Sequence, residues 1–161
     1  MKRLLALLFA VVFTVAQIAC TGGGPLSKLD STLDYAPFFF DGLAIAGKIT
    51  PERAEFYKRG VARGEAIADK TKTCLSDNVK SDAQCYADLA TDTRTLINEF
   101  YPRSTEGKVA QFAALLTDVV NLIVQKNTPV VGAGASAHPV TEKQIENKID
   151  ELDKLLHSED K

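Results

Sequence analysis

Apolar residues recur at steps of three and four along most of this chain, the spacing that places them on one face of an α-helix. The pattern predicts two short helices followed by four longer ones, over 26–35, 37–46, 51–75, 82–101, 105–126 and 142–156. No segment alternates apolar and polar residues as a half-buried β-strand does. The sequence therefore predicts an all-α fold, a small bundle of four to five helices.

Capping signals mark several of the predicted helix ends. Thr50 is followed by a proline and a glutamate, which together form a strong helix start. Thr141 and Gln144 match a capping box at the start of the last helix. Gly47 is expected to end the second short helix.

Gly60 and Gly64 lie on the apolar side of the helix predicted over 51–75. Each glycine weakens a helix by up to about 1 kcal/mol relative to alanine. We therefore expect a neighbouring helix to approach closely at both positions. A GxxxG pair drives helix pairing in membranes only within an apolar segment, and the charged residues around these glycines exclude that role.

Tyr35 and three consecutive phenylalanines, Phe38, Phe39 and Phe40, surround the start of the second short helix. Three neighbouring residues cannot all face one side of a helix. Either two phenylalanines enter the core and one covers a seam, or the segment anchors a partner, a ligand or the membrane interface. This aromatic segment is the first candidate binding surface.

The second candidate binding surface is the last helix. It follows a stretch rich in proline and glycine, 128–140, which predicts an irregular linker. Its apolar residues form one narrow stripe: Ile145, Ile149, Leu152 and Leu156. Such a stripe is either an ordinary contact within the bundle or a detachable seam for a partner. The helix before the linker, 105–126, is the most apolar and is expected at the centre of the bundle.

The N-terminus has the features of an export signal. Lys2 and Arg3 precede an unbroken apolar run over 4–16, and a small residue stands directly before Cys20. The segment Gln17-Ile18-Ala19-Cys20 resembles the lipobox of bacterial lipoproteins, with a glutamine where an aliphatic residue is usual. The resemblance covers residues 1–20 only.

This resemblance implies that residues 1–19 are a signal peptide and that Cys20 becomes a lipidated N-terminus. Its acyl chains, palmitate among them, would form a stable membrane anchor at about 0.8 kcal/mol per buried methylene. Residues 20–25 would then be a flexible, glycine-rich tether, followed by a single helical domain over 26–161. Thr21, in place of an aspartate, resembles proteins sorted to the outer membrane of a diderm cell. The alternatives are ordinary signal cleavage near Gly22 and a retained signal anchor.

Composition adds few constraints on the remaining domain. The chain is 45% hydrophobic and 25% charged, as is ordinary for a globular protein, and about 140 residues suffice for one core. Without Lys2 and Arg3, 17 basic residues stand against 21 acidic ones, a net charge of −4. This balance gives no reason to expect nucleic-acid binding. No second unbroken stretch reaches the roughly 18 apolar residues of a membrane span.

Three cysteines leave one unpaired in an oxidising compartment. Lipid on Cys20 would leave Cys74 and Cys85 as a pair. These two residues fall in the last turn of one predicted helix and the first turn of the next, which suits a disulfide across a helical hairpin. A loop of about ten residues corresponds to roughly 2–3 kcal/mol of stabilisation. A pair of buried free thiols is the alternative, and no histidine lies near enough to predict a metal site.

The sequence contains no recognisable catalytic or cofactor motif. It lacks G-x-S-x-G, H-E-x-x-H and a phosphate-binding loop. The two histidines, His138 and His157, fall in the predicted linker and the last helical turn, where we expect them to be solvated. We therefore expect that the protein is not an enzyme and binds no metal and no cofactor. The alternative is an enzyme with an unrecognised catalytic site.

Together these features predict a membrane-tethered lipoprotein of the cell envelope with a non-catalytic protein-binding or scaffolding role. Its partners would be the lipid bilayer, through acyl chains on Cys20, and a protein whose identity the sequence leaves open. In a diderm host it would face the periplasm from the outer membrane. The alternative is a carrier that holds a small apolar ligand between the aromatic segment and the central helix. An exposed aromatic patch would favour partner binding, and an enclosed apolar cavity would favour the carrier.

Overall fold

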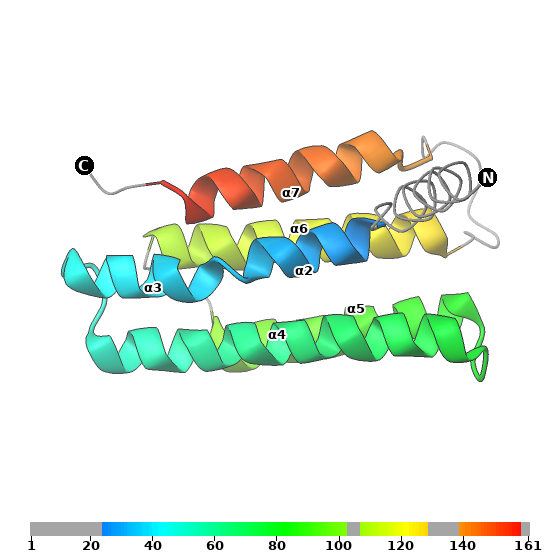
Figure 1. Ribbon diagram of the computed structural model, residues 1–161, viewed down its shortest axis with the longest axis horizontal. Helices are drawn as coiled ribbons and strands as arrows, with labels where there is room; N and C mark the ends of the chain where they lie inside the picture. The colour runs from blue at the N-terminus through cyan, green and yellow to red at the C-terminus, as the bar shows by residue number, and fades with distance from the viewer. Residues whose placement is uncertain (1–23, 103–106, 129–138, 159–161) are drawn as a thin grey trace, which may run out of the picture.

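The computed structural model describes residues 24–102, 107–128 and 139–158. Within these ranges the chain forms six helices and no strand: α2 (Pro25–Leu33), α3 (Ala36–Ile45), α4 (Pro51–Asp77), α5 (Asp82–Phe100), α6 (Gly107–Asn127) and α7 (Glu142–Leu156). Four long helices lie alongside one another, and α2 and α3 follow each other along one side as a fifth rod (Figure 1). The predicted all-α bundle is confirmed.

Neighbours in sequence are neighbours in space throughout the bundle. The helix α4 packs on α5, α5 on α6, and α6 on α7. The helix α2 closes the arrangement by contacting both α4 and α7, whereas α3 packs on α4 (Figure 1).

The buried face of α6 packs between α5 and α7. It consists of Val109, Phe112, Ala113, Leu116, Val119, Val120 and Ile123. By length and composition, α6 is the one helix among the described residues that could cross a membrane. Its sequence contains no unbroken apolar run of that length, because Gln111, Asp118 and Asn121 interrupt it. In the bundle its apolar face is occupied by packing against its two neighbours.

Side-chain caps hold the starts of three helices. The hydroxyl of Thr50 accepts a hydrogen bond from the backbone N–H of Arg53 at 3.3 Å, as predicted from the sequence. The predicted capping box at α7 is present, and α5 begins with a second one. Each box satisfies backbone N–H groups that the first helical turn leaves without a partner.

Two helices end in residues with left-handed backbone conformation. Gly47 has φ of +68° and ends α3, as predicted, with the N–H of Lys48 donating to the carbonyl of Leu43 at 2.9 Å. Asn78 has φ of 52° and ends α4 at Asp77, two residues later than predicted. Asparagine tolerates this conformation better than most residues, which explains the stop.

The start of the domain also differs slightly from the prediction. Pro25 is the first residue of α2, with Gly24 at its N-cap, so the predicted tether over 20–25 runs into a helix. Proline suits the first helical position because its missing N–H has no helical partner there. Cys20, His138 and most of the predicted linker lie outside the described residues.

The helical hairpin of α4 and α5 is closed by a disulfide between Cys74 and Cys85, whose Cα atoms lie 5.8 Å apart. The predicted pairing is confirmed. Nearer the other end, a β-carbon on Gly60 would lie 2.8 Å from Cβ of Phe100, so the predicted close approach is confirmed there. At Gly64 a β-carbon would meet only Leu33, at 3.8 Å, which is ordinary contact. The predicted close approach at Gly64 is therefore wrong.

Candidate functional site

The apolar stripe of the last helix belongs to the core. Ile145, Ile149 and Leu152 are fully buried and Leu156 is 7% exposed, against α6 and α2. Burying one such side chain contributes about 1.5–3 kcal/mol, so α7 docks firmly within its own chain. These four residues are thus an ordinary bundle contact, and the hypothesis that they offer a binding surface is wrong.

The aromatic segment divides between the core and the surface. Phe39 and Phe40 are buried, at 6% and 0% exposure, whereas Phe38 is 73% exposed. The ring of Phe40 lies 5.3 Å from those of both Tyr57 and Phe112, measured between centroids. Phe39 also stacks on Phe112, at 6.4 Å. Two phenylalanines therefore enter the core, and the third projects into solvent.

Exposed apolar side chains are concentrated along one helix. Tyr35, Phe38 and Ile45 are three of the four exposed large hydrophobic residues in the described part of the chain. Their spacing of three and seven residues places them in one row along α3 and its N-cap. Gly42 lies in the same row, and a β-carbon there would meet no atom within 4 Å. We call Tyr35, Phe38, Gly42 and Ile45 the α3 stripe.

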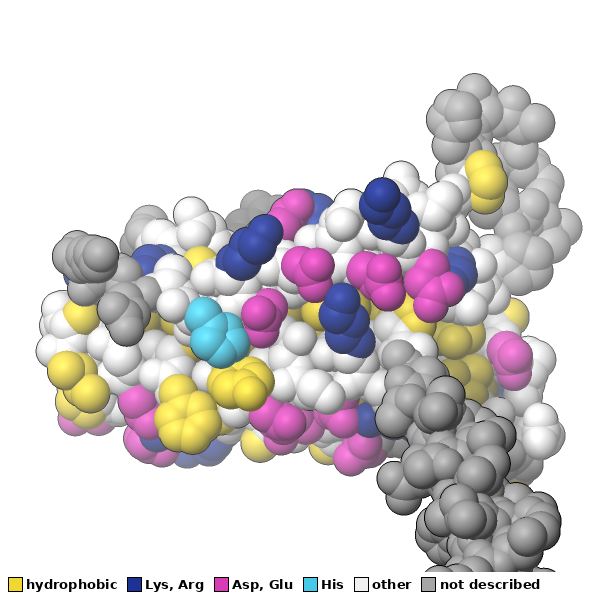
Figure 2. Space-filling model, turned by 45° about the horizontal axis from the view of Figure 1, so that its top comes forward, with side chains coloured by type: hydrophobic (Ala, Val, Ile, Leu, Met, Phe, Trp, Pro, Cys, Tyr) yellow, Lys and Arg dark blue, Asp and Glu magenta, His cyan; other side chains and the backbone are white. Residues whose placement is uncertain are grey.

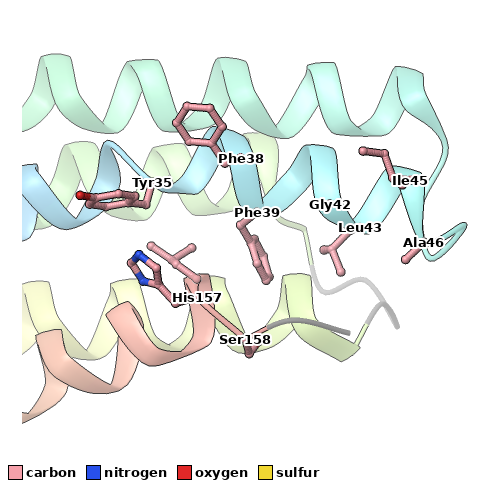
Figure 3. Close-up of a pocket in the computed structure, with 10 residues that line it drawn as sticks. Tyr35, Phe38, Phe39, Gly42, Leu43, Ile45, Ala46, His157 and Ser158 are labelled. Carbon is pink, nitrogen blue, oxygen red and sulfur yellow. The ribbon is translucent and has the colours of Figure 1, made fainter. Parts of the chain in front are cut away.

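A groove of about 770 Å³ runs between α3 and the C-terminal end of α7. The stripe forms part of its wall; the lining residues are Tyr35, Phe38, Phe39, Gly42, Leu43, Ile45, Ala46, Leu156, His157 and Ser158. Figure 3 shows Phe39 and Leu43 pointing from α3 toward the end of α7, while Phe38 points to the other side of α3. The lining is mostly apolar, which suits an apolar side chain of a binding partner.

His157 closes one end of the groove, beside Tyr35 (Figure 3). The two ring centroids are 4.7 Å apart, with the planes inclined at 53°. The Nδ1 atom of His157 lies 2.9 Å from the carbonyl oxygen of Asp153 and 3.4 Å from its carboxylate. His157 is exposed, as expected from the sequence, and its ring also contacts Tyr35 because α7 ends beside the start of α3.

Acidic residues line the junction of α2 and α3 with α4. Two lysines bridge carboxylates there: Lys58 contacts Asp41 at 2.8 Å and Glu55 at 2.5 Å, and Lys72 contacts Asp30 at 2.5 Å and Asp69 at 3.2 Å. The same junction contains Asp34 and Glu65. We call these six carboxylates the acidic seam: Asp30, Asp34, Asp41, Glu55, Glu65 and Asp69.

Asp34 and Glu65 have no lysine or arginine within ion-pair distance among the described residues. Partial burial of Glu65 raises the pKa of its carboxyl, and repulsion from Asp34, Asp30 and Asp69 raises it further. The seam therefore carries more negative charge than its two lysines neutralise. Figure 2 shows acidic side chains bordering the area where hydrophobic side chains lie next to the histidine.

The described residues contain no group of three or more histidine, cysteine or acidic side chains placed to hold a metal ion. The groove has a single imidazole, from His157, and the hydroxyl of the adjacent Ser158 donates a hydrogen bond to the carbonyl oxygen of Leu155 at 2.7 Å. Its chemistry is that of a recognition surface, with apolar contacts, one polar ring and nearby negative charge. The sequence pattern points to Tyr35 and Phe38 but not to Ile45, the third exposed apolar residue of the stripe. It also gives no sign of His157 or Glu65, which packing brings near Tyr35 and Asp34.

No protein-family model, no curated protein and no solved structure matches this chain. Its function therefore has to be inferred from its own residues.

Proposed function

We propose that this protein is a lipid-anchored lipoprotein of the cell envelope whose helical bundle binds a protein partner through the α3 stripe. The observation that carries the proposal is the gathering of Tyr35, Phe38 and Ile45 on one exposed helix face beside an apolar groove. Exposed apolar groups in a contiguous patch are typical of binding surfaces, whereas scattered ones are not. The lipobox-like segment ending at Cys20 supports the anchored location.

A carrier of a small apolar ligand is less well supported. Such a ligand was expected between the aromatic segment and α6. That interface is filled by rings in direct contact, since Phe39 and Phe40 both meet Phe112. An apolar ligand would have to displace these core side chains, at a cost of several kcal/mol.

The partner-binding proposal is tested by photo-crosslinking in intact cells. A photoreactive amino acid at Phe38 should yield a defined crosslinked protein. The control position is Val79, which is 85% exposed and lies in the loop between α4 and α5. Equal products from both positions, or none from Phe38, would contradict the proposal.

The location is tested separately. Cys20→Ala removes the sulfur atom that the lipobox-like segment assigns to the thioether, so this variant should move from the membrane fraction to the soluble fraction. Metabolic labelling with a palmitate analogue should mark the wild type and not the variant. Unchanged membrane retention of Cys20→Ala would refute the lipid anchor and leave the binding surface to be judged on the crosslinking result.

A further inference from the structure

Phe38 lies between the apolar groove and the acidic seam. It comes one helical turn after Asp34 and just under one turn before Asp41, both members of the seam. Its ring points away from the α7 side of α3 (Figure 3). The apolar row of α3 is therefore bordered by negative charge, from Asp34 at the C-cap of α2 and from Asp41 within α3.

We propose that this surface binds a basic amphipathic helix of a protein partner. This inference rests on the proposed function and adds the chemistry of the partner. Apolar side chains of that helix would contact Phe38 and Ile45 and enter the groove. Its lysines or arginines would lie over Asp34 and Glu65, the two carboxylates of the seam that have no cation within ion-pair distance among the described residues. Amphipathic helices commonly dock in apolar grooves through residues spaced by one turn.

Charge complementarity indicates the sign of the partner's charge. The seam holds six carboxylates and two lysines, each lysine already shared between two acids. Repulsion among the remaining charges is present in the free protein. A cationic partner would relieve it, whereas an acidic partner would increase it. The attraction would weaken as salt is added, because these groups are partly exposed.

A membrane surface does not match these features. The acidic seam would be repelled by the anionic headgroups of a bilayer surface. The groove is also distant from the tether. Ile45 is 21 residues after Gly24, about 30 Å of helix at 1.5 Å per residue, and α3 lies at the end of the bundle opposite the start of α2 (Figure 1).

A second copy of the chain does not match either. A symmetric dimer built on the α3 stripe would bring identical surfaces together. Each copy would then place its own acidic seam next to that of the other, and like charges at close range are unfavourable.

The test uses the protein as the cell processes it, in non-ionic detergent. The probe is a fluorescent 18-residue helical peptide with leucines on one face and lysines on the other, and its counterpart has glutamate in place of each lysine. The lysine peptide should bind and the glutamate peptide should not. Phe38→Ala should weaken binding at least about ten-fold, and Glu65→Gln about two- to five-fold. The control Asp118→Asn removes one charge from the exposed side of α6 and should leave binding unchanged.

Four results would overturn the inference. The first is that the lysine peptide does not bind, or binds no better than its glutamate counterpart. The second is that Glu65→Gln and Asp118→Asn have equal effects. The third is that the Cys20→Ala protein floats with phosphatidylglycerol vesicles and that Phe38→Ala abolishes this, which would assign the surface to the bilayer. A crosslink from Phe38 in cells that survives Glu65→Gln unchanged would sustain the proposed function and reject the basic partner.

Discussion

The hydroxyl of Tyr101 donates a hydrogen bond to the backbone carbonyl oxygen of Tyr57 at 2.8 Å. The two rings are stacked, with centroids 5.6 Å apart. This contact joins the C-cap of α5 to the second turn of α4. It is possible only because Gly60 has no side chain, since a β-carbon there would lie 2.7 Å from the Tyr101 hydroxyl oxygen.

Tyr101→Phe should destabilise the protein by about 1 kcal/mol, the usual net contribution of one hydrogen bond. The ring contacts remain, so the loss is limited to the hydroxyl. Urea unfolding followed by circular dichroism measures the change. A destabilisation larger than about 3 kcal/mol would show that the hydroxyl makes stabilising interactions besides this hydrogen bond.

The same residue should make stability sensitive to strongly alkaline pH. Burial raises the pKa of the Tyr101 phenol well above its ordinary value of 10.0. The folded protein therefore retains this proton when the unfolded chain loses it, and stability falls as pH rises above about 10. Tyr101→Phe should show a smaller loss of stability between pH 9 and pH 11 than the wild type.

Gly60 and Gly64 form a matched pair in one helix. Gly60→Ala should destabilise by about 1–3 kcal/mol, because the new methyl group would overlap Phe100 and Tyr101. Gly64→Ala should stabilise by up to about 1 kcal/mol, because the site has room and alanine favours the helix. Thermal unfolding of both variants checks the opposite signs. Equal effects would mean that packing around Gly60 is looser than described.

Removal of the Cys74–Cys85 disulfide should lower stability by about 2–3 kcal/mol. The double variant Cys74→Ala, Cys85→Ala should still fold, since the hairpin also has buried apolar contacts along α4 and α5. Intact mass should show that the wild type gains two hydrogen atoms on reduction. Reduction that leaves the melting temperature unchanged would contradict the stabilising role.

Glu65→Gln should stabilise the free protein by about 0.5 kcal/mol at neutral pH, because it removes repulsion from Asp69 one turn away and from Asp34. The raised pKa of Glu65 means that the folded state holds its proton more tightly than the unfolded state. In the wild type, Glu65 therefore contributes to stability below pH 4.5, and this contribution is lost as the pH rises. The gain from Glu65→Gln should accordingly disappear at pH 4. Asp118→Asn, whose carboxylate lies 3.9 Å from Lys148, should show no such gain.

Local signals in the sequence were sufficient for most of the fold. Thr50, Thr141 and Gly47 each act through their own backbone neighbours, so the chain around them identifies the helix end. The pairing of Cys74 with Cys85 also followed from a short loop between two predicted helices. The prediction of a close approach was wrong at Gly64. The sequence places this residue correctly on the helix, but its distance from the next element depends on packing.

The candidate site was only partly predictable. The helix α3 is apolar on nearly every side, so no period in its sequence distinguishes Phe38 from Phe40. Contacts of Phe40 with Tyr57 and Phe112, from two other helices, decide which ring is buried. His157 reaches Tyr35 from the far end of the chain. Neither the burial of Phe40 nor the contact between His157 and Tyr35 can be read from the neighbouring sequence.

The helix α2 is the first element that the tether reaches, and its fastening has a mechanical consequence. Lys28 binds Asp150 of α7 at 3.0 Å, and Asp30 binds Lys72 of α4, while Leu26 and Leu29 are buried along the same helix. With an anchor at Cys20, a force on the domain would enter at Gly24, along the axis of α2 (Figure 1). Such a pull shears these contacts together instead of peeling them one after another. The bundle should therefore resist a pull at its anchored end through several contacts at once.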